Sequence, residues 1–328
     1  MKEKKGGKLG LLAALLILVI GGLLGIDISG LLKSADAENA TSYSAEAGQT
    51  TKEKENVKKS VSPETDGSLL QVHYIDVGQG DATLLVCDGQ TVLIDAGNNN
   101  QGTAVQSYLN SQNVEILDYV IGTHPDADHV GGLDVVITKF DCRTILLTEE
   151  EKDTITYRDV LDAMKYKNYK RTAPVVGDTY QLGSAEFTIV GPGRLISDSN
   201  DNSIAIILRH GGNTFYFEGD AGEKEEEDIL DSGIELMADV YKIGHHGSKT
   251  STTDEMLDSV NPAYAVISVG EDNRYGHPNA EVLNKLRKAG IQVFRTDEQG
   301  TIVAESDGEQ LTFNCAPSES WQAGEPRK

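Results

Sequence analysis

THPDADHVGG, the stretch from Thr123 to Gly132, places His124, Asp126, Asp128 and His129 within six positions. It follows ILDYVIG, an apolar run without a clean period of two, which predicts a buried strand. Imidazole and carboxylate side chains are common metal ligands, but an ordinary polar turn has the same composition. The stretch therefore predicts a metal site only if other strand ends supply further ligands.

The same side-chain chemistry recurs at the ends of three other predicted strands. These positions are Asp95 in TVLIDAG, Asp220 in TFYFEGD, and the pair His245 and His246 in VYKIGHHG. Side chains at the carboxyl ends of strands point into the crevice at the sheet edge, where ligands bind. Four strand ends of this kind predict a metal site built from distant parts of the chain.

The N-terminal residues 1–32 are set apart by composition. Four lysines precede a run from Leu9 to Ile26 that contains no charged residue and is just long enough to cross a bilayer. The basic flank predicts an N-terminus inside the cell and a chain exported after it. We favour a single-pass membrane anchor; a signal peptide is the alternative, because Ala35-Asp36-Ala37 offers a cleavage pattern. Both place the rest of the chain outside the cytoplasm, anchored or secreted.

The remaining chain divides into a linker, one large domain and a tail. Residues 33–68 are rich in Ser, Thr, Ala, Glu and Lys, which predicts a disordered linker. Residues 69–316 form the predicted domain, and residues 317–328 a C-terminal tail of loop composition with Trp321. The formal net charge of −23 argues against a broad electrostatic grip on nucleic acid.

The order of predicted elements indicates the fold class. Two blocks of strands, each followed by alternating strands and helices, predict two sheets packed face to face with helices outside, a four-layer α/β sandwich. One helix is expected over 130–140, and the acidic cluster Glu223–Asp228 is expected to be a solvated helix face. Cys87 and Cys142 border apolar runs and are expected to be buried thiols.

Six motifs in order resemble the metallo-β-lactamase superfamily, and within it the hydrolase domain of ComEC competence proteins. They are DVGQGDATLL, LIDAG, THPDADHVGGL, FEGDAG, KIGHHGSKTS and RYGHPN, spanning about Val72 to Phe294. The resemblance implies an αββα sandwich and a hydrolase that uses two divalent metal ions and no organic cofactor. The chain has one apolar segment and no multi-span channel portion, so a standalone anchored or secreted relative is expected.

The resemblance also assigns roles to the strand-end residues. It implies that His124 and Asp126 bind one metal ion, that Asp128 and His129 bind the other, and that Asp220 bridges both. His245 is favoured over His246 as the remaining ligand, and Asp95 is expected to orient the ligands from behind. Asp76, Gln79 and Asp81 are expected to belong to the scaffold close to the site.

One histidine of the superfamily pattern is missing from this chain. The matching stretch is SDSNDNSIAII, and the resemblance suggests Asn202 as a weak oxygen ligand or substrate donor, leaving one metal site weaker. The ligand set is rich in oxygen, which shifts the preference towards Mn²⁺ while Zn²⁺ stays possible.

Two loops are candidates for contacts with a substrate. Ser248 and Lys249 after HHG can contact a phosphate, or the loop is an ordinary start of a helix with Thr252 or Thr253 as N-cap. Arg274 and His277 lie in RYGHPN, where His277 is expected to be a general acid or phosphate contact; a structural turn is the alternative.

The expected function is a metal-dependent phosphodiesterase or nuclease, with single-stranded DNA as the substrate that the resemblance implies. Asp128 is expected to hold the attacking water. Hydrolysis of another cell-surface phosphodiester or ester, such as a phosphorylcholine or teichoic-type group or a lactone, is the alternative. A metal-stabilised binding domain without turnover is a third.

Overall fold

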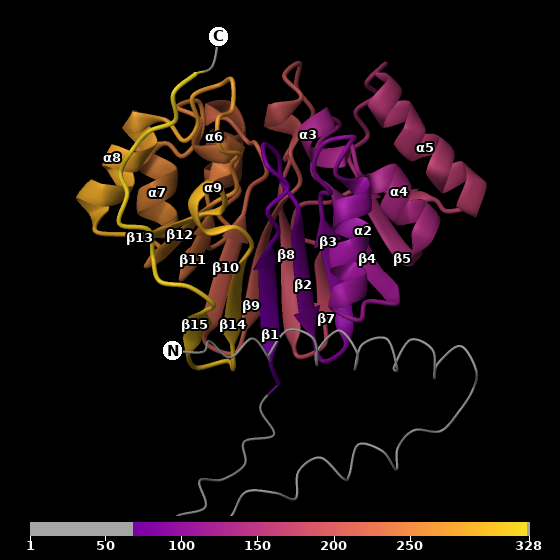
Figure 1. Ribbon diagram of the computed structural model, residues 1–328, viewed down its shortest axis with the longest axis horizontal. Coiled ribbons are helices and arrows are strands. Elements are labelled where there is room, and N and C mark those ends of the chain that lie inside the picture. Colours follow the sequence, from indigo (N-terminus) through magenta and orange to yellow (C-terminus); the bar gives the residue numbers. More distant parts are fainter. Residues whose placement is uncertain (1–67, 327–328) are drawn as a thin grey trace, which may run out of the picture. The chain divides into compact units, whose positions relative to one another are not determined.

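A computed structural model describes residues 68–326, which form two β-sheets packed face to face (Figure 1). The eight-stranded sheet has the order β15-β14-β1-β2-β3-β4-β5-β6, and the seven-stranded sheet has the order β13-β12-β11-β10-β9-β8-β7. We call them sheet A and sheet B.

The strands are short, and most of them are buried. Sheet A contains β1 (Leu70–Tyr74), β2 (Thr83–Cys87), β3 (Gln90–Ile94), β4 (Ile116–Gly122), β5 (Asp141–Leu147), β6 (Arg171–Thr172), β14 (Ile302–Ser306) and β15 (Leu311–Phe313). Sheet B contains β7 (Thr179–Leu182), β8 (Ala185–Gly191), β9 (Ala205–His210), β10 (Asn213–Phe217), β11 (Val240–Lys242), β12 (Tyr264–Ile267) and β13 (Gln292–Arg295).

Strand β4 shows why the apolar runs fold into sheets buried on both faces. Its side chains alternate, because successive residues of a strand point to opposite faces. Tyr119 and Ile121 pack against the core between the sheets, whereas Val120, which lies between them in the strand, packs into the core under the outer helices. Since both faces are covered, the run needs no polar alternation.

Helices cover the outer faces of both sheets, and the predicted four-layer α/β sandwich is confirmed. On sheet A lie α2 (Gly102–Ser111), α4 (Leu133–Lys139) and α5 (Ile155–Lys167); on sheet B lie α6 (Glu223–Asp231), α7 (Asp254–Val260) and α8 (Ala280–Ala289). The short helices α3 (Ala127–Val130) and α9 (Thr296–Gln299) lie in loops that follow strands.

Parallel pairing brings the functional strand ends to one edge of the sandwich. Strands β3, β4 and β5 of sheet A are parallel, as are β10, β11, β12 and β13 of sheet B. Their carboxyl ends therefore lie at the same edge within each sheet, the upper edge in Figure 1, where α3 is drawn. The candidate ligands follow these ends.

The structure corrects two local expectations. The single helix over 130–140 is divided into α3 and α4 by Gly131 and Gly132, which pack against neighbouring backbone with no room for a side chain. The cluster Glu223–Asp228 is solvated only in part: Glu223, Lys224 and Glu227 are exposed, whereas Glu225 and Glu226 are buried. Cys87 and Cys142 are buried free thiols, as predicted.

The N-terminal predictions lie outside the described residues, apart from Ser68 at the end of the linker. Between residues 68 and 326, no helix is long and apolar enough to cross a membrane.

Candidate metal centre

The loop after β4 forms the floor of the site and is held by Asp95 at the end of β3. Asp95 accepts hydrogen bonds from the Thr123 backbone N–H (2.9 Å) and the Thr123 hydroxyl (2.8 Å). Its Oδ2 also lies 2.7 Å from His129 Nδ1. A histidine that donates from Nδ1 to a carboxylate keeps the lone pair of Nε2 free for a metal. Asp95 therefore orients the His129 ring, which is the role that the resemblance implies for it.

Asp220, after β10, lies at the centre of the site. Its Oδ2 is 3.2 Å from His129 Nε2, 3.6 Å from His246 Nε2 and 3.7 Å from His245 Nε2. Its Oδ1 is buried and has no hydrogen-bond partner. One carboxylate thus faces side chains from both sheets.

His246 is oriented from behind by the loop after β12. Its Nδ1 lies 2.9 Å from the carbonyl oxygen of Ser268, so that Nε2 faces Asp128 Oδ2 and Asp220 Oδ2, each 3.6 Å away. His245 and His246 both have left-handed backbone, with φ values of 47° and 56°. Such conformations cost free energy in residues other than glycine, and they cluster at functional sites.

The residues present fit divalent metal ions. Four overlapping groups of the described residues bring their ligand atoms within 4.8 Å of one another: His124, His129 and Asp220; Asp128, His129 and His246; Asp81, Asp220 and His246; and Asp81, Asp95 and His129. The Nε2 atoms of the three histidines and Oδ1 of Asp220 are buried without hydrogen-bond partners. Unpaired buried polar atoms are costly, and cations would satisfy them. Because Asp220 belongs to two of these groups, it can bridge two ions.

Burial and neighbouring charges set the protonation of the ligands. Burial, followed by the charge of His129, lowers the pKa of His124 to about 4. Burial also acts to lower the pKa of His129, but Asp220 and Asp95 raise it well above its ordinary value. Burial acts to raise the pKa of Asp128, yet the neighbouring His246 imidazole and the charge of His129 hold it below its ordinary range. The site favours a positive charge at its centre, which a metal ion would supply in place of a proton.

Two predicted ligands lie at the margin of the site. Asp126 is a third exposed, and its Oδ1 forms an ion pair with Lys152 and accepts a 2.8 Å hydrogen bond from Ser199. It belongs to none of the ligand groups found among the described residues. His245 is also outside them and contacts Thr250 Oγ1 through Nδ1 (3.3 Å). His246 belongs to two of the ligand groups, and His245 Nε2 lies 3.7 Å from Asp220 Oδ2, so both histidines stay within reach of the central carboxylate.

The Asn202 side chain is engaged by other residues than the candidate ligands. Its Oδ1 accepts from the Ile196 backbone N–H (2.7 Å) and its Nδ2 donates to Glu150 (2.8 Å). The next residue, Ser203, lies behind the site instead. Ser203 Oγ is 3.3 Å from His124 Nδ1 and accepts from the Asp220 backbone N–H (3.0 Å). The stretch that lacks the histidine therefore supports two other ligands.

Asp81 and Lys242 form a buried ion pair beside the ligands, and Lys242 is a residue that the sequence analysis missed. Their side chains are 5% and 3% exposed. Asp81 Oδ1 is 3.8 Å from His246 Nδ1, and the Asp81 backbone N–H donates to the carbonyl oxygen of Asp128 (3.0 Å). The pair joins a loop of sheet A to β11 of sheet B. Lys242 ends an otherwise apolar strand, and a lysine at the end of a buried strand was the available signal for a buried ion pair.

The loop after His246 contacts the candidate ligand His245 through its own hydroxyl groups. Ser248 is buried, and its Oγ lies 2.9 Å from Thr250 Oγ1, which in turn contacts His245. Lys249 is exposed. Thr253 is the N-cap of α7 and accepts from Met256 N–H (3.1 Å), one of the two caps predicted.

A pocket of about 500 Å³ opens beside Asp128. It is lined by Gln79, Asn98, Asp126, Ala127, Asp128, Asn273, Arg274 and Tyr275. The Arg274 guanidinium lies 4.8 Å from the centre of the Tyr275 ring and donates to its hydroxyl (2.6 Å). Arg274 thus places a cation on the wall of a pocket whose other charged groups are carboxylates.

His277 lies between this pocket and the histidine pair. Its ring centre is 5.5 Å from that of His245, and it stacks on Tyr275 at 5.5 Å. Its Nδ1 is buried without a hydrogen-bond partner. Burial, followed by the charges of His246 and His245, lowers its pKa to about 4. His277 is therefore neutral near pH 7 and can donate one hydrogen bond.

The two sheets, the outer helices and the ligands at the strand ends are those of a metal-dependent hydrolase. The chain belongs to the Metallo-beta-lactamase superfamily, whose sequence profile matches residues 75–271.

Among characterised proteins, the chain is similar to bacterial competence and recombination proteins. It is 30% identical to ComE operon protein 3 of Bacillus subtilis, over 75% of this chain and 34% of that protein. It is 30% identical to Recombination protein 2 of Haemophilus influenzae, over 71% of this chain and 28% of that protein. It is also 30% identical to Competence protein ComA of Neisseria gonorrhoeae, over 69% of this chain and 31% of that protein. The matched region spans about a third of each relative.

Proposed function

We propose that the protein is an extracytoplasmic metal-dependent phosphodiesterase that cleaves single-stranded DNA. The observation that carries this proposal is the position of Asp220, which belongs to two ligand groups at once. A carboxylate shared between two cations is suited to phosphodiester hydrolysis, because the reaction develops negative charge on both the attacking and the leaving oxygen.

The proposed ligands are His124, His129, Asp128, Asp220 and His246, and they mix nitrogen with oxygen donors. Such a set suits Mn²⁺ or Zn²⁺. When bound, the ions lower the pKa of a water molecule and stabilise charge on the phosphate. Asp81 lies within reach of the same atoms; Lys242 pairs with its Oδ2, and its Oδ1 is buried without a hydrogen-bond partner.

The chain's own side chains would orient the reactants. Asp128 lines the pocket and is partly exposed, so it can hold the attacking water by a hydrogen bond. Arg274 supplies a fixed positive charge for a phosphate oxygen. Neutral His277 can donate a hydrogen bond to the leaving oxygen. For His277 to deliver a proton, the negative charge of a bound phosphate must first raise its pKa.

The names of the relatives link them to competence and recombination, which favours a nucleic acid as substrate. Because the chain is strongly acidic, we expect DNA to contact it only near the site, where Arg274 and the cations attract the phosphate. The export of the domain through residues 1–32, anchored or secreted, is part of the proposal and rests on the N-terminal sequence.

The test is an assay of the full-length chain with Mn²⁺ or Zn²⁺ on a single-stranded oligonucleotide and on bis-p-nitrophenyl phosphate. We expect cleavage of both, lowered about 10²–10⁴-fold in Asp128→Ala and unchanged in Asp153→Ala, a 93% exposed aspartate. Cleavage of only the small diester would favour another phosphodiester or ester substrate. Metal binding without cleavage of either would show a binding domain and contradict the proposal.

A further inference from the structure

The C-terminal residues 318–326 are not a free tail but cross the outer side of sheet B. In Figure 1 the yellow chain runs upward from β15, past β13, to the edge that carries the metal centre. We call these residues the strap. Its first contact is with β13, where the Ser318 backbone N–H donates to the carbonyl oxygen of Val293 (2.7 Å).

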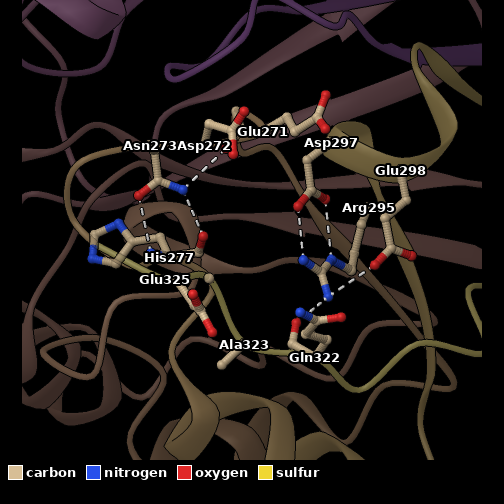
Figure 2. A pocket seen from close by; sticks show the side chains of 12 residues that line it. Glu271, Asp272, Asn273, His277, Arg295, Asp297, Glu298, Gln322, Ala323 and Glu325 are labelled. Atoms are coloured by element: carbon tan, nitrogen blue, oxygen red, sulfur yellow. Dashed lines mark hydrogen bonds and ion pairs between the residues drawn. The ribbon is translucent and has the colours of Figure 1, made fainter. Parts of the chain in front are cut away.

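The middle of the strap is anchored at two points. Trp321 packs against the apolar core under α7 and α8, with the Arg287 guanidinium 5.7 Å from its ring centre. Arg295, which is buried and paired with Asp297 and Glu298, donates to the carbonyl oxygen of Gln322 (2.7 Å). Figure 2 shows this arginine reaching the strap across a pocket of about 320 Å³.

The end of the strap is in direct contact with the loop that contains His277. The Gly324 backbone N–H donates to the carbonyl oxygen of Pro278 (3.0 Å), and a Cβ atom on Gly324 would overlap the carbonyl oxygen of His277. On the other side of the contact, a Cβ atom on Gly276 would approach Pro326 to 2.9 Å. The strap and the loop are therefore in close contact, with no space for a side chain at Gly324 or Gly276.

From inside, the same loop is held by Asn273. Its Oδ1 accepts from the backbone N–H groups of Tyr275 and His277, both at 3.0 Å, and its Nδ2 donates to the carbonyl oxygen of His277 (2.6 Å). Figure 2 shows the two contacts with His277. The His277 backbone is thus fixed between Asn273 and Gly324. Its ring, on the other side of the backbone, faces His245.

We infer that the strap is a positioning element for the proposed reaction, with Gly324 as the positioning residue that sets the distance between His277 and the metal centre. The inference rests on the proposed function only for the role of His277. Gly324→Ala must displace either the strap or the loop, and a misplacement of about 1 Å at a reacting group costs about 100-fold in rate. Gly324 itself is not expected to contact a substrate.

The experiment compares Gly324→Ala with Gly193→Ala in the full-length chain. Gly193 is an exposed glycine whose added Cβ would meet nothing closer than 3.8 Å. We expect Gly324→Ala to lower kcat on bis-p-nitrophenyl phosphate about 10- to 100-fold, with metal content kept and little change in KM. Gly193→Ala should match the parent.

A double-mutant cycle separates positioning from general damage. In a His277→Gln background, Gly324→Ala should have no further effect on kcat. An equal loss in both backgrounds would overturn the inference, as would a parent-like kcat for Gly324→Ala. Trp321 is the chain's single tryptophan, so its fluorescence reports directly whether the strap stays docked.

If the parent cleaves no diester, the proposed function fails, and the placement of His277 is measured instead by the NMR signals of its imidazole, assigned with His277→Gln. The inference then requires that Gly324→Ala moves these signals and that Gly193→Ala does not. Unmoved signals in both variants would overturn it.

Discussion

Replacing Lys242 by methionine tests the buried ion pair that joins the two sheets beside the metal centre. Lys242→Met leaves the carboxylate of Asp81 buried without its ammonium partner; both side chains are at most 5% exposed. Breaking such a pair costs about 3–5 kcal/mol of unfolding free energy. At about 2–4 °C per kcal/mol for a domain of this size, the melting temperature should fall by about 6–20 °C.

The assay is thermal unfolding in the presence of a chelator, with Lys249→Met as control because Lys249 is exposed. The double variant Asp81→Asn/Lys242→Met removes both charges and should recover most of the loss. Added Mn²⁺ should stabilise Lys242→Met more than the parent, because Asp81 lies within 4.8 Å of ligand atoms on Asp220 and His246. A Lys242→Met protein within about 1 kcal/mol of the control would refute the reasoning.

Two further substitutions test the packing around the site. Burial, above all, raises the pKa of Glu225 well above its ordinary value of 4.5, so the folded protein keeps this proton after the unfolded chain has lost it, and stability should fall as pH rises above about 4.5. Glu225→Gln should flatten that decline in urea unfolding between pH 5 and pH 8, whereas exposed Glu309→Gln should not; parallel curves would contradict the assignment. Gly131→Ala would place a Cβ against the backbone of Ala127 and Asn99, and we expect it to unfold at least about 2 kcal/mol more easily than Gly193→Ala and to bind less metal.

Much of the fold could be predicted because many strands are apolar along their whole length and are followed by histidine, aspartate and glycine residues. The run ILDYVIG has no polar alternation, and β4 is indeed covered on both sides. The turn residues beside the ligands, such as Gly131, follow from backbone contacts that leave no room for a side chain. Periodicity and composition carry this kind of information directly.

The sequence carried less information about which polar groups are buried together. Glu225 and Glu226 belong to an acidic run that is typical of a solvated face, yet both are buried, where Glu225 accepts from the Ser203 backbone N–H (3.1 Å) and Glu226 from the Thr253 backbone N–H (2.9 Å). Lys242 and Asp81 are far apart in sequence, so their pairing depends on how the two sheets pack. The choice between His245 and His246 depends on two successive left-handed residues, a conformation that side-chain spacing does not reveal.

The strap shows a similar limit. The segment with Trp321 has loop composition, and its backbone contacts with β13 and with the His277 loop leave no periodic pattern in the sequence. The tryptophan, a large apolar side chain in a polar stretch, was the available signal that part of the segment packs, and the sequence analysis did not use it.

The most direct test of the account is the metal content of the purified protein, measured by elemental analysis after loading with Mn²⁺ or Zn²⁺ and removal of free ions. We predict two ions per chain for the parent and for Asp153→Ala. Asp220→Ala should lose at least one of them, because Asp220 faces both ligand groups. A folded parent that retains no ion, or an Asp220→Ala protein that retains both, would contradict the shared-carboxylate site.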